Sequence, residues 1–228
     1  MEMQRVRFPA AGEAPPTLEG ELWLPETADA VPGVVIAHPH PQRGGSMQNN
    51  VVAALGEGLS TAGIAWLRFN FRGVGASEGR YSEGDDERLD VLGALAFLAE
   101  QPGIAADRIG LAGYSFGARV SLSVIGDTPR VLGLLCVAPP LREPLEPTSI
   151  ACPYLVLVGD RDGNVSDGVD RYAACLPDPD RLQVVPGTDH FWWGFEPVLA
   201  DAAQRFFAEA LVSPPLTLTL SPEGRGDP

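Results

Sequence analysis

The chain contains no lysine, so all 16 of its basic residues are arginine. A P-loop nucleotide site, a pyridoxal phosphate Schiff base and the S-x-x-K group of some serine enzymes each need a lysine side chain, so all three are excluded. The basic residues are also outnumbered by 30 acidic ones, which gives a formal net charge of −14. Nucleic acid and anionic membrane surfaces repel such a chain, and we expect neither as a partner.

Cysteine is scarce, and long apolar runs are missing. The three cysteines, Cys136, Cys152 and Cys175, are odd in number and widely spaced, and none belongs to a C-x-x-C pair. This pattern is typical of a reduced compartment. The first residues lack the apolar core of a signal peptide, so we expect a cytoplasmic protein. No run approaches the ~18 apolar residues that a membrane-spanning helix needs, so we expect no membrane span.

Short apolar runs alternate with helical stretches along most of the chain. Several of the runs are apolar throughout, as parallel strands covered on both faces are, and parallel strands require crossover helices. The sequence therefore predicts an α/β fold with a doubly wound, mostly parallel sheet, whose first two strands form an antiparallel hairpin at the edge. The predicted strands are residues 5–8, 17–24, 33–37, 65–69, 108–112, 131–137, 154–158 and 182–185.

The helices predicted between these strands have apolar faces at helical spacing. A further helix-like run covers residues 118–125. The positions expected on the buried faces are Val51, Leu55 and Leu59 in the first helix, Leu89, Leu92, Leu95 and Ala99 in the second, and Val198, Ala202, Phe206 and Ala210 in the last.

With 228 residues, the chain fits one domain, which we place at residues 1–212. Residues 139–152 join two core strands, are rich in proline and are too few for a helical cap domain, so we expect an open site without a lid. Residues 213–228 contain four prolines and have no neighbouring element to pair with, and we expect a disordered extension there.

The most informative motif is G-x-S-x-G at residues 113–117. It lies where the apolar run 108–112 gives way to the helix-like run 118–125. Glycines on both sides of the serine permit a sharp strand-to-helix turn that thrusts the hydroxyl outward, which is the geometry of a nucleophile elbow. Ser115 is therefore the candidate nucleophile.

A serine nucleophile needs a histidine to take its proton and a carboxylate to orient that histidine. Of the three histidines, His38 and His40 precede the elbow and only His190 follows the last core strand. The acid is expected just after the strand 154–158, where Asp162 lies further out on the turn than Asp160. We favour Asp162 and expect Asp160 to bond the amides of the turn.

Two backbone N–H groups are expected to form an oxyanion hole. One belongs to Phe116, which follows the nucleophile at a helix N-terminus. The other should come from the loop after the strand 33–37, where Pro39 and Pro41 have no N–H to donate. His40 is therefore the best donor in that loop, with Gln42 as the alternative.

The pair His38-x-His40 also has the spacing of metal ligands. No cysteine or carboxylate lies at ligand spacing nearby, so we expect structural use, with His38 bracing its loop by hydrogen bonds. We expect neither a metal nor a cofactor.

Other residues are candidates for the substrate pocket. Trp192 and Trp193 follow His190 and either wall an acyl pocket or pack against the final helix. Arg72 lies in the glycine-rich loop 70–77, where it either anchors the loop by bonding carbonyl groups or contacts an anionic substrate.

Taken together, these motifs resemble those of the small lidless bacterial α/β-hydrolases, serine esterases related to the dienelactone hydrolases. The resemblance spans roughly residues 1–212. It implies a serine hydrolase of carboxylic esters, with Ser115, Asp162 and His190 in the positions of the catalytic triad. Dienelactone hydrolases use a cysteine nucleophile, so that particular activity is not expected. The matching segments are residues 38–41, 44–50, 70–77, 113–117, 159–162 and 189–191.

The sequence thus predicts a cofactor-independent hydrolase that cleaves small carboxylic or thiol esters through an acyl-serine. A peptide or amide hydrolase with the same three residues is an alternative, and so is a non-catalytic binding protein of the same fold. We expect a small-molecule ester as the partner and a monomer or homodimer as the assembly.

Overall fold

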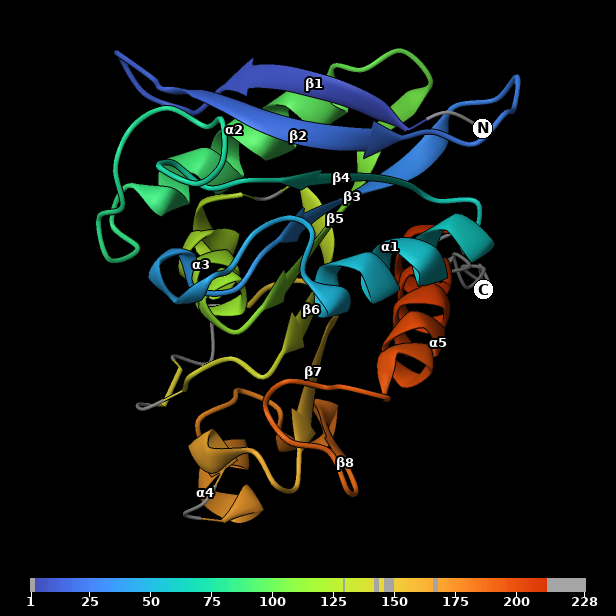
Figure 1. Cartoon of the computed structure of the whole chain (residues 1–228). Coiled ribbons are helices and arrows are strands. Elements are labelled where there is room, and N and C mark those ends of the chain that lie inside the picture. The colour runs from blue at the N-terminus through green and yellow to red at the C-terminus, as the bar shows by residue number, and fades with distance from the viewer. Residues whose placement is uncertain (1–2, 129, 142–143, 146–149, 166–167, 213–228) are drawn as a thin grey trace, which may run out of the picture.

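The computed structural model describes residues 3–128, 130–141, 144–145, 150–165 and 168–212. Strands that are distant in sequence line up in one eight-stranded sheet through the middle of the fold (Figure 1). In the order of their positions in the sheet, the strands are β1 (Gln4–Pro9), β2 (Thr17–Trp23), β4 (Ala65–Phe69), β3 (Val31–Ala37), β5 (Ile104–Tyr114), β6 (Val131–Val137), β7 (Tyr154–Gly159) and β8 (Leu182–Val185).

The pairing of the strands confirms the predicted sheet. β1 and β2 form an antiparallel hairpin at one edge, and β2 pairs antiparallel with β4. From β4 to β8 all neighbours are parallel. The bounds of β4, β6 and β8 agree with the prediction, whereas β5 extends beyond the predicted strand 108–112 at both ends. At its C-terminal end, β5 reaches Tyr114, the residue before Ser115.

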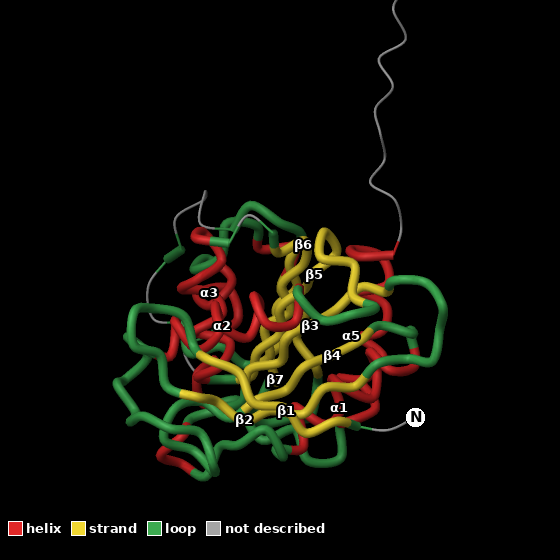
Figure 2. The backbone as a smooth tube through the Cα atoms, turned by 90° about the horizontal axis from the view of Figure 1, so that it is seen from above, coloured by secondary structure: helices red, strands yellow, loops and turns green. Residues whose placement is uncertain are grey.

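Helices cover both faces of the sheet. α1 (Asn50–Thr61) and α5 (Glu196–Phe207) pack on one face, and α2 (Glu87–Ala99) and α3 (Phe116–Val124) pack on the other (Figure 2). The short helix α4 (Val169–Ala173) follows β7. Shorter helical turns are η1 (Pro41–Arg43), η2 (Ile125–Asp127), η3 (Gly163–Val165), η4 (Pro179–Arg181) and η5 (Ala208–Val212).

The predicted buried face is correct for α1 and wrong for α5. Val51, Leu55 and Leu59 of α1 are fully buried, as expected. In α5 the buried face is shifted by one residue from the expected set, and Val198 is exposed. The ring of Phe207 lies against Gly110 of β5, where the missing side chain leaves room for it. The fully or almost fully buried residues of α5 and η5 are Leu199, Ala203, Phe207 and Leu211.

The predicted face of α2 is only partly correct, with Leu95 buried as expected. Leu89, Leu92 and Ala99 are only partly buried, whereas the carboxylates of Glu87 and Asp90 are fully buried. Both acids turn inward because they have partners there. Asp90 bonds Arg72, and Glu87 accepts hydrogen bonds from the 82–84 loop. The two acids therefore share the buried face of α2 with Val91, Leu95 and Leu98.

No cap domain covers the sheet in the described part of the chain. None of the described residues between β6 and β7 is helical. The expected disordered extension at residues 213–228 lies outside the described residues. Within the described part of the chain, no helix is both long and apolar enough to cross a bilayer.

Candidate active site

Ser115 occupies the turn between β5 and α3, as the motif predicts. Its backbone adopts φ 52° and ψ −113°, a strained conformation for a residue with a side chain. The flanking glycines are required by close packing. A Cβ atom on Gly117 would lie 2.4 Å from the carbonyl oxygen of Ala37, and one on Gly113 would lie 2.6 Å from the amide nitrogen of Ala118.

Three side chains from separate parts of the chain meet at this turn. The Oγ of Ser115 lies 3.0 Å from the Nε2 of His190, and the Nδ1 of His190 lies 2.7 Å from the Oδ2 of Asp162. The carboxylate of Asp162 is almost completely buried, and about a quarter of the His190 side chain is exposed. The structure thus brings together the serine, histidine and acid that the sequence singles out.

The two aspartates that compete for the acid position have different partners. Asp162 contacts His190, whereas the Oδ1 of Asp160 accepts a 2.8 Å hydrogen bond from the amide of Gly187, which lies in another loop and not in the turn of Asp160 as expected. Asp189, next to the histidine in sequence, accepts a hydrogen bond from the amide of Phe191. Asp160 and Asp189 therefore brace the loop that carries His190.

Three further contacts hold that loop in place. The hydroxyl of Tyr114 donates a hydrogen bond to the carbonyl oxygen of His190, and the Nδ2 of the Asn50 side chain donates one to the carbonyl oxygen of Phe191. Trp192 has φ 62°, in the left-handed region, while its ring is fully buried in the core beside α1 and α5. Burial of a large ring stabilises a backbone conformation that would otherwise be unfavourable.

The loop after β3 lies beside the elbow. The rings of His40 and Phe116 are 5.3 Å apart, so the two residues whose amides are expected to form an oxyanion hole are neighbours. The amide of Gln42, the alternative donor, is already occupied, since it donates to the Nδ1 of His40. His40 therefore remains the candidate in this loop.

His38 acts as a structural brace. Its Nδ1 lies 2.6 Å from the carbonyl oxygen of Pro39, and its Nε2 accepts a hydrogen bond from the amide of Phe71. Burial lowers the pKa of His38 to about 4, so its ring is neutral near pH 7. The expectation that His38 supports its loop by hydrogen bonds is confirmed.

For two of the residues considered as pocket candidates, the structure favours the structural alternative. Trp192 is fully buried in the core and has no surface to offer a substrate. The guanidinium of Arg72 bonds both oxygens of Asp90 and also pairs with Asp86, so it anchors its loop through carboxylates and not through carbonyl groups. Trp193 is 70% exposed and remains a candidate for substrate contact.

Sequence reasoning missed Tyr81 and Tyr114 as residues of the site. Tyr81 bonds His40, and Tyr114 bonds the backbone of His190. A signal for Tyr114 was present, because a tyrosine at the end of a buried strand needs a partner for its hydroxyl. Nothing in the sequence pattern points to Tyr81.

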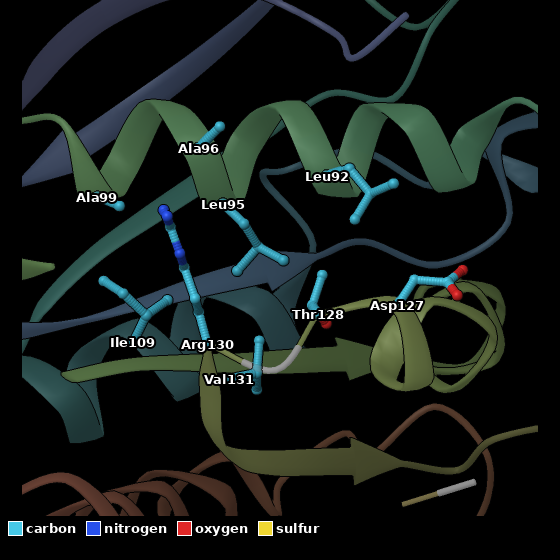
Figure 3. Close-up of a pocket in the computed structure, with 9 residues that line it drawn as sticks. All are labelled: Leu92, Leu95, Ala96, Ala99, Ile109, Asp127, Thr128, Arg130 and Val131. Carbon is cyan, nitrogen blue, oxygen red and sulfur yellow. The ribbon is translucent and has the colours of Figure 1, made fainter. Parts of the chain in front are cut away.

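A separate cavity of about 220 Å³ lies between α2 and the sheet (Figure 3). Leu92 and Leu95 line it from the helix, and Ile109 and Val131 line it from β5 and β6. Ile109 precedes Ser115 by six residues of extended chain, which is roughly 20 Å. This cavity is therefore remote from the elbow.

Comparisons with known proteins agree with the fold. The family model for X-Pro dipeptidyl-peptidase (S15 family) matches residues 17–143, which include Ser115. An uncharacterized protein of Rickettsia prowazekii is 31% identical over 188 residues, covering 77% of each chain.

Two solved structures are similar over almost the whole chain. An α/β serine hydrolase homologue from Coxiella burnetii has 32% identity and a TM-score of 0.73, covering 90% of this chain and 96% of that one. An α/β serine hydrolase without a lid from Xanthomonas campestris has 29% identity and a TM-score of 0.76, covering 94% and 98%. The chain therefore belongs to the X-Pro dipeptidyl-peptidase (S15) family and has the fold of the lidless α/β serine hydrolases.

Proposed function

We propose that the protein hydrolyses small carboxylic or thiol esters through an acyl-serine intermediate on Ser115. The observation that carries this proposal is the unbroken series of contacts from Ser115 through His190 to Asp162, with distances of 3.0 and 2.7 Å. A serine hydroxyl alone is a weak nucleophile, and a positioned imidazole with an orienting carboxylate is the arrangement that activates it.

In the first step, the Oγ of Ser115 attacks the ester carbonyl as the Nε2 of His190 takes its proton. Asp162 holds the other ring nitrogen, which keeps the imidazole in the required tautomer and stabilises its positive charge. The carbonyl oxygen becomes an oxyanion, and the amides of Phe116 and His40 donate hydrogen bonds to it. Such donors are typically worth about 10²–10³-fold in turnover each.

In the second step, His190 returns its proton to the leaving alcohol or thiol, which departs and leaves the acyl group on Ser115. His190 then removes a proton from a water molecule, which attacks the acyl carbonyl. Collapse of the second tetrahedral intermediate breaks the bond to Ser115, releases the carboxylic acid and returns the proton to the serine.

The open surroundings of the elbow favour short or compact acyl groups. No helical cap stands between β6 and β7 in the described residues to enclose a long chain. Trp193, exposed three residues after His190, offers an apolar surface to the substrate.

Replacement of the nucleophile tests the proposal. We expect Ser115→Ala to lower kcat/KM for 4-nitrophenyl acetate by at least about 10⁴-fold and to abolish labelling by a fluorophosphonate. Ser123→Ala is the matched control, because Ser123 lies on α3 and its hydroxyl bonds the carbonyl of Val120. Normal turnover or normal labelling of Ser115→Ala would contradict the proposal.

The family match favours a second candidate, hydrolysis of peptides after proline by the same three residues. The matched segment ends at residue 143, before both Asp162 and His190. Alanyl-prolyl-4-nitroanilide separates the two candidates. Efficient release of nitroaniline, with kcat/KM above that for 4-nitrophenyl acetate, would favour the peptidase.

A further inference from the structure

A third ring lies beside the two residues of the proposed oxyanion hole. Tyr81, from the loop between β4 and α2, has its ring centre 5.2 Å from that of His40 and 5.8 Å from that of Phe116. Its hydroxyl oxygen lies 3.1 Å from the Nε2 of His40. Tyr81 is only partly buried, and its ring contacts Phe116, the residue that follows Ser115 in the elbow.

The hydrogen bonds of His40 determine the direction of the bond to Tyr81. The amide of Gln42 donates to the Nδ1 of His40 at 3.2 Å, so this nitrogen carries no proton. Burial, with the nearby charges of Arg43 and Arg119, lowers the pKa of His40, which keeps the ring neutral near pH 7. The single ring proton is then on Nε2, and Nε2–H donates to the hydroxyl oxygen of Tyr81.

The hydroxyl of Tyr81 therefore accepts from His40 and must direct its own proton elsewhere. Within the described ranges of the chain, His40 is its one hydrogen-bond partner. Burial raises the pKa of Tyr81, so the phenol keeps its proton at neutral pH. A hydroxyl that accepts a hydrogen bond is polarised and becomes a stronger donor.

We propose that Tyr81 is a specificity-determining residue, whose hydroxyl donates a hydrogen bond to an oxygen acceptor on the acyl group of the substrate. This inference rests on the proposed ester hydrolysis and narrows its substrate class. The preferred substrates are esters of short acids with an ether, hydroxyl or keto oxygen close to the reacting carbonyl. A site that donates a hydrogen bond rejects an analogue without the acceptor, because a donor is left unpaired.

Two esters of equal chain length test this assignment. 4-Nitrophenyl methoxyacetate carries an oxygen where 4-nitrophenyl butyrate carries a methylene group. We expect Tyr81→Phe, which keeps the ring contacts with His40 and Phe116, to lower kcat/KM for methoxyacetate about 10-fold and for butyrate less than about 2-fold. The two esters differ in intrinsic reactivity. We therefore compare the ratio of their kcat/KM values in the variant with the same ratio in the wild type, which cancels that difference.

Tyr154→Phe is the matched control. Tyr154 begins β7, and its hydroxyl bonds the backbone of Asp178. The ratio of kcat/KM for methoxyacetate to that for butyrate should stay at the wild-type value in this variant. Rates are expressed per active site titrated with a fluorophosphonate, so partial unfolding does not affect them. Equal losses on both esters, or no loss on either, would overturn the role of Tyr81. A wild-type protein that cleaves neither ester and resists the fluorophosphonate would instead overturn the proposed function, and this inference with it.

Discussion

The hydroxyl of Tyr114 donates a 2.6 Å hydrogen bond to the backbone carbonyl oxygen of His190. Tyr114 is the last residue of β5 and directly precedes Ser115, so the strand that presents the nucleophile also holds the backbone of its histidine partner. This contact joins two segments that are 76 residues apart in sequence. It holds the backbone of His190, whereas Asp162 contacts the imidazole ring. The two contacts therefore position the imidazole independently.

Tyr114→Phe is expected to lower kcat about 10-fold and to leave KM within about 2-fold of wild type. The variant keeps the buried ring and removes the hydrogen bond, so the imidazole is held less firmly when it takes the proton. Steady-state kinetics with a short-chain ester give both constants, and the thermal midpoint reports on the fold. An unchanged kcat in a folded variant would show that Tyr114 does not position His190.

Asp162→Asn and Asp160→Asn form a matched pair on one turn. We expect Asp162→Asn to lower kcat about 10³–10⁴-fold, because an amide does not hold the imidazole in the correct tautomer. Asp160→Asn should leave kcat within a few-fold of wild type and cost about 1 kcal/mol of stability, since it weakens the bond to Gly187. Kinetics and urea unfolding of both variants distinguish them. The reverse order of activities would assign the acid role to Asp160.

Asp90→Asn is expected to lower the free energy of unfolding by about 3–5 kcal/mol. Asp90 is fully buried and bonds Arg72, so loss of its charge leaves a nearly buried guanidinium without its main partner. Asp86→Asn is the control, because the Asp86 side chain is more than half exposed and its pair with Arg72 is worth less than about 1 kcal/mol. Urea unfolding at neutral pH measures the free energy of unfolding of both variants. Equal losses in the two would refute the dominant role of Asp90.

His38 should make the protein less stable as the pH falls from 6.5 towards 4. Its pKa is about 4 in the folded protein against 6.5 ordinarily, so between these values the unfolded chain binds a proton that the folded one excludes. Neutral His38 therefore costs the folded protein nothing above pH 6.5, and its effect lowers the free energy of unfolding by roughly 2–3 kcal/mol by pH 4.5.

Other acidic groups also titrate in this range, so the effect of His38 is read from a comparison with His38→Gln. Urea unfolding of both proteins at pH 7.5 and pH 4.5 gives the two pH dependences. We expect the variant to lose less stability than the wild type on acidification. An identical loss in both proteins would exclude His38 as the source.

The positions of the strands along the chain and the residues of the elbow follow from local patterns. Buried parallel strands read as continuous apolar runs, which is why the bounds of β4, β6 and β8 were predictable. The faces of α2 and α5 were not predictable, because several apolar residues in each helix compete at helical spacing. Partners distant in sequence decided between them, Arg72 for α2 and the sheet around Gly110 for α5.

By itself, the sequence determined the sheet, the strained turn at Ser115 and the succession of serine, acid and histidine, because spacing and glycine sterics act over a few residues. Only the tertiary structure decided that Asp162 and not Asp160 meets His190, that Trp192 is buried and that Arg72 is paired. It also placed the hydroxyl of Tyr81 against His40. Each of these outcomes depends on the direction of a side chain across a distance that no local pattern encodes.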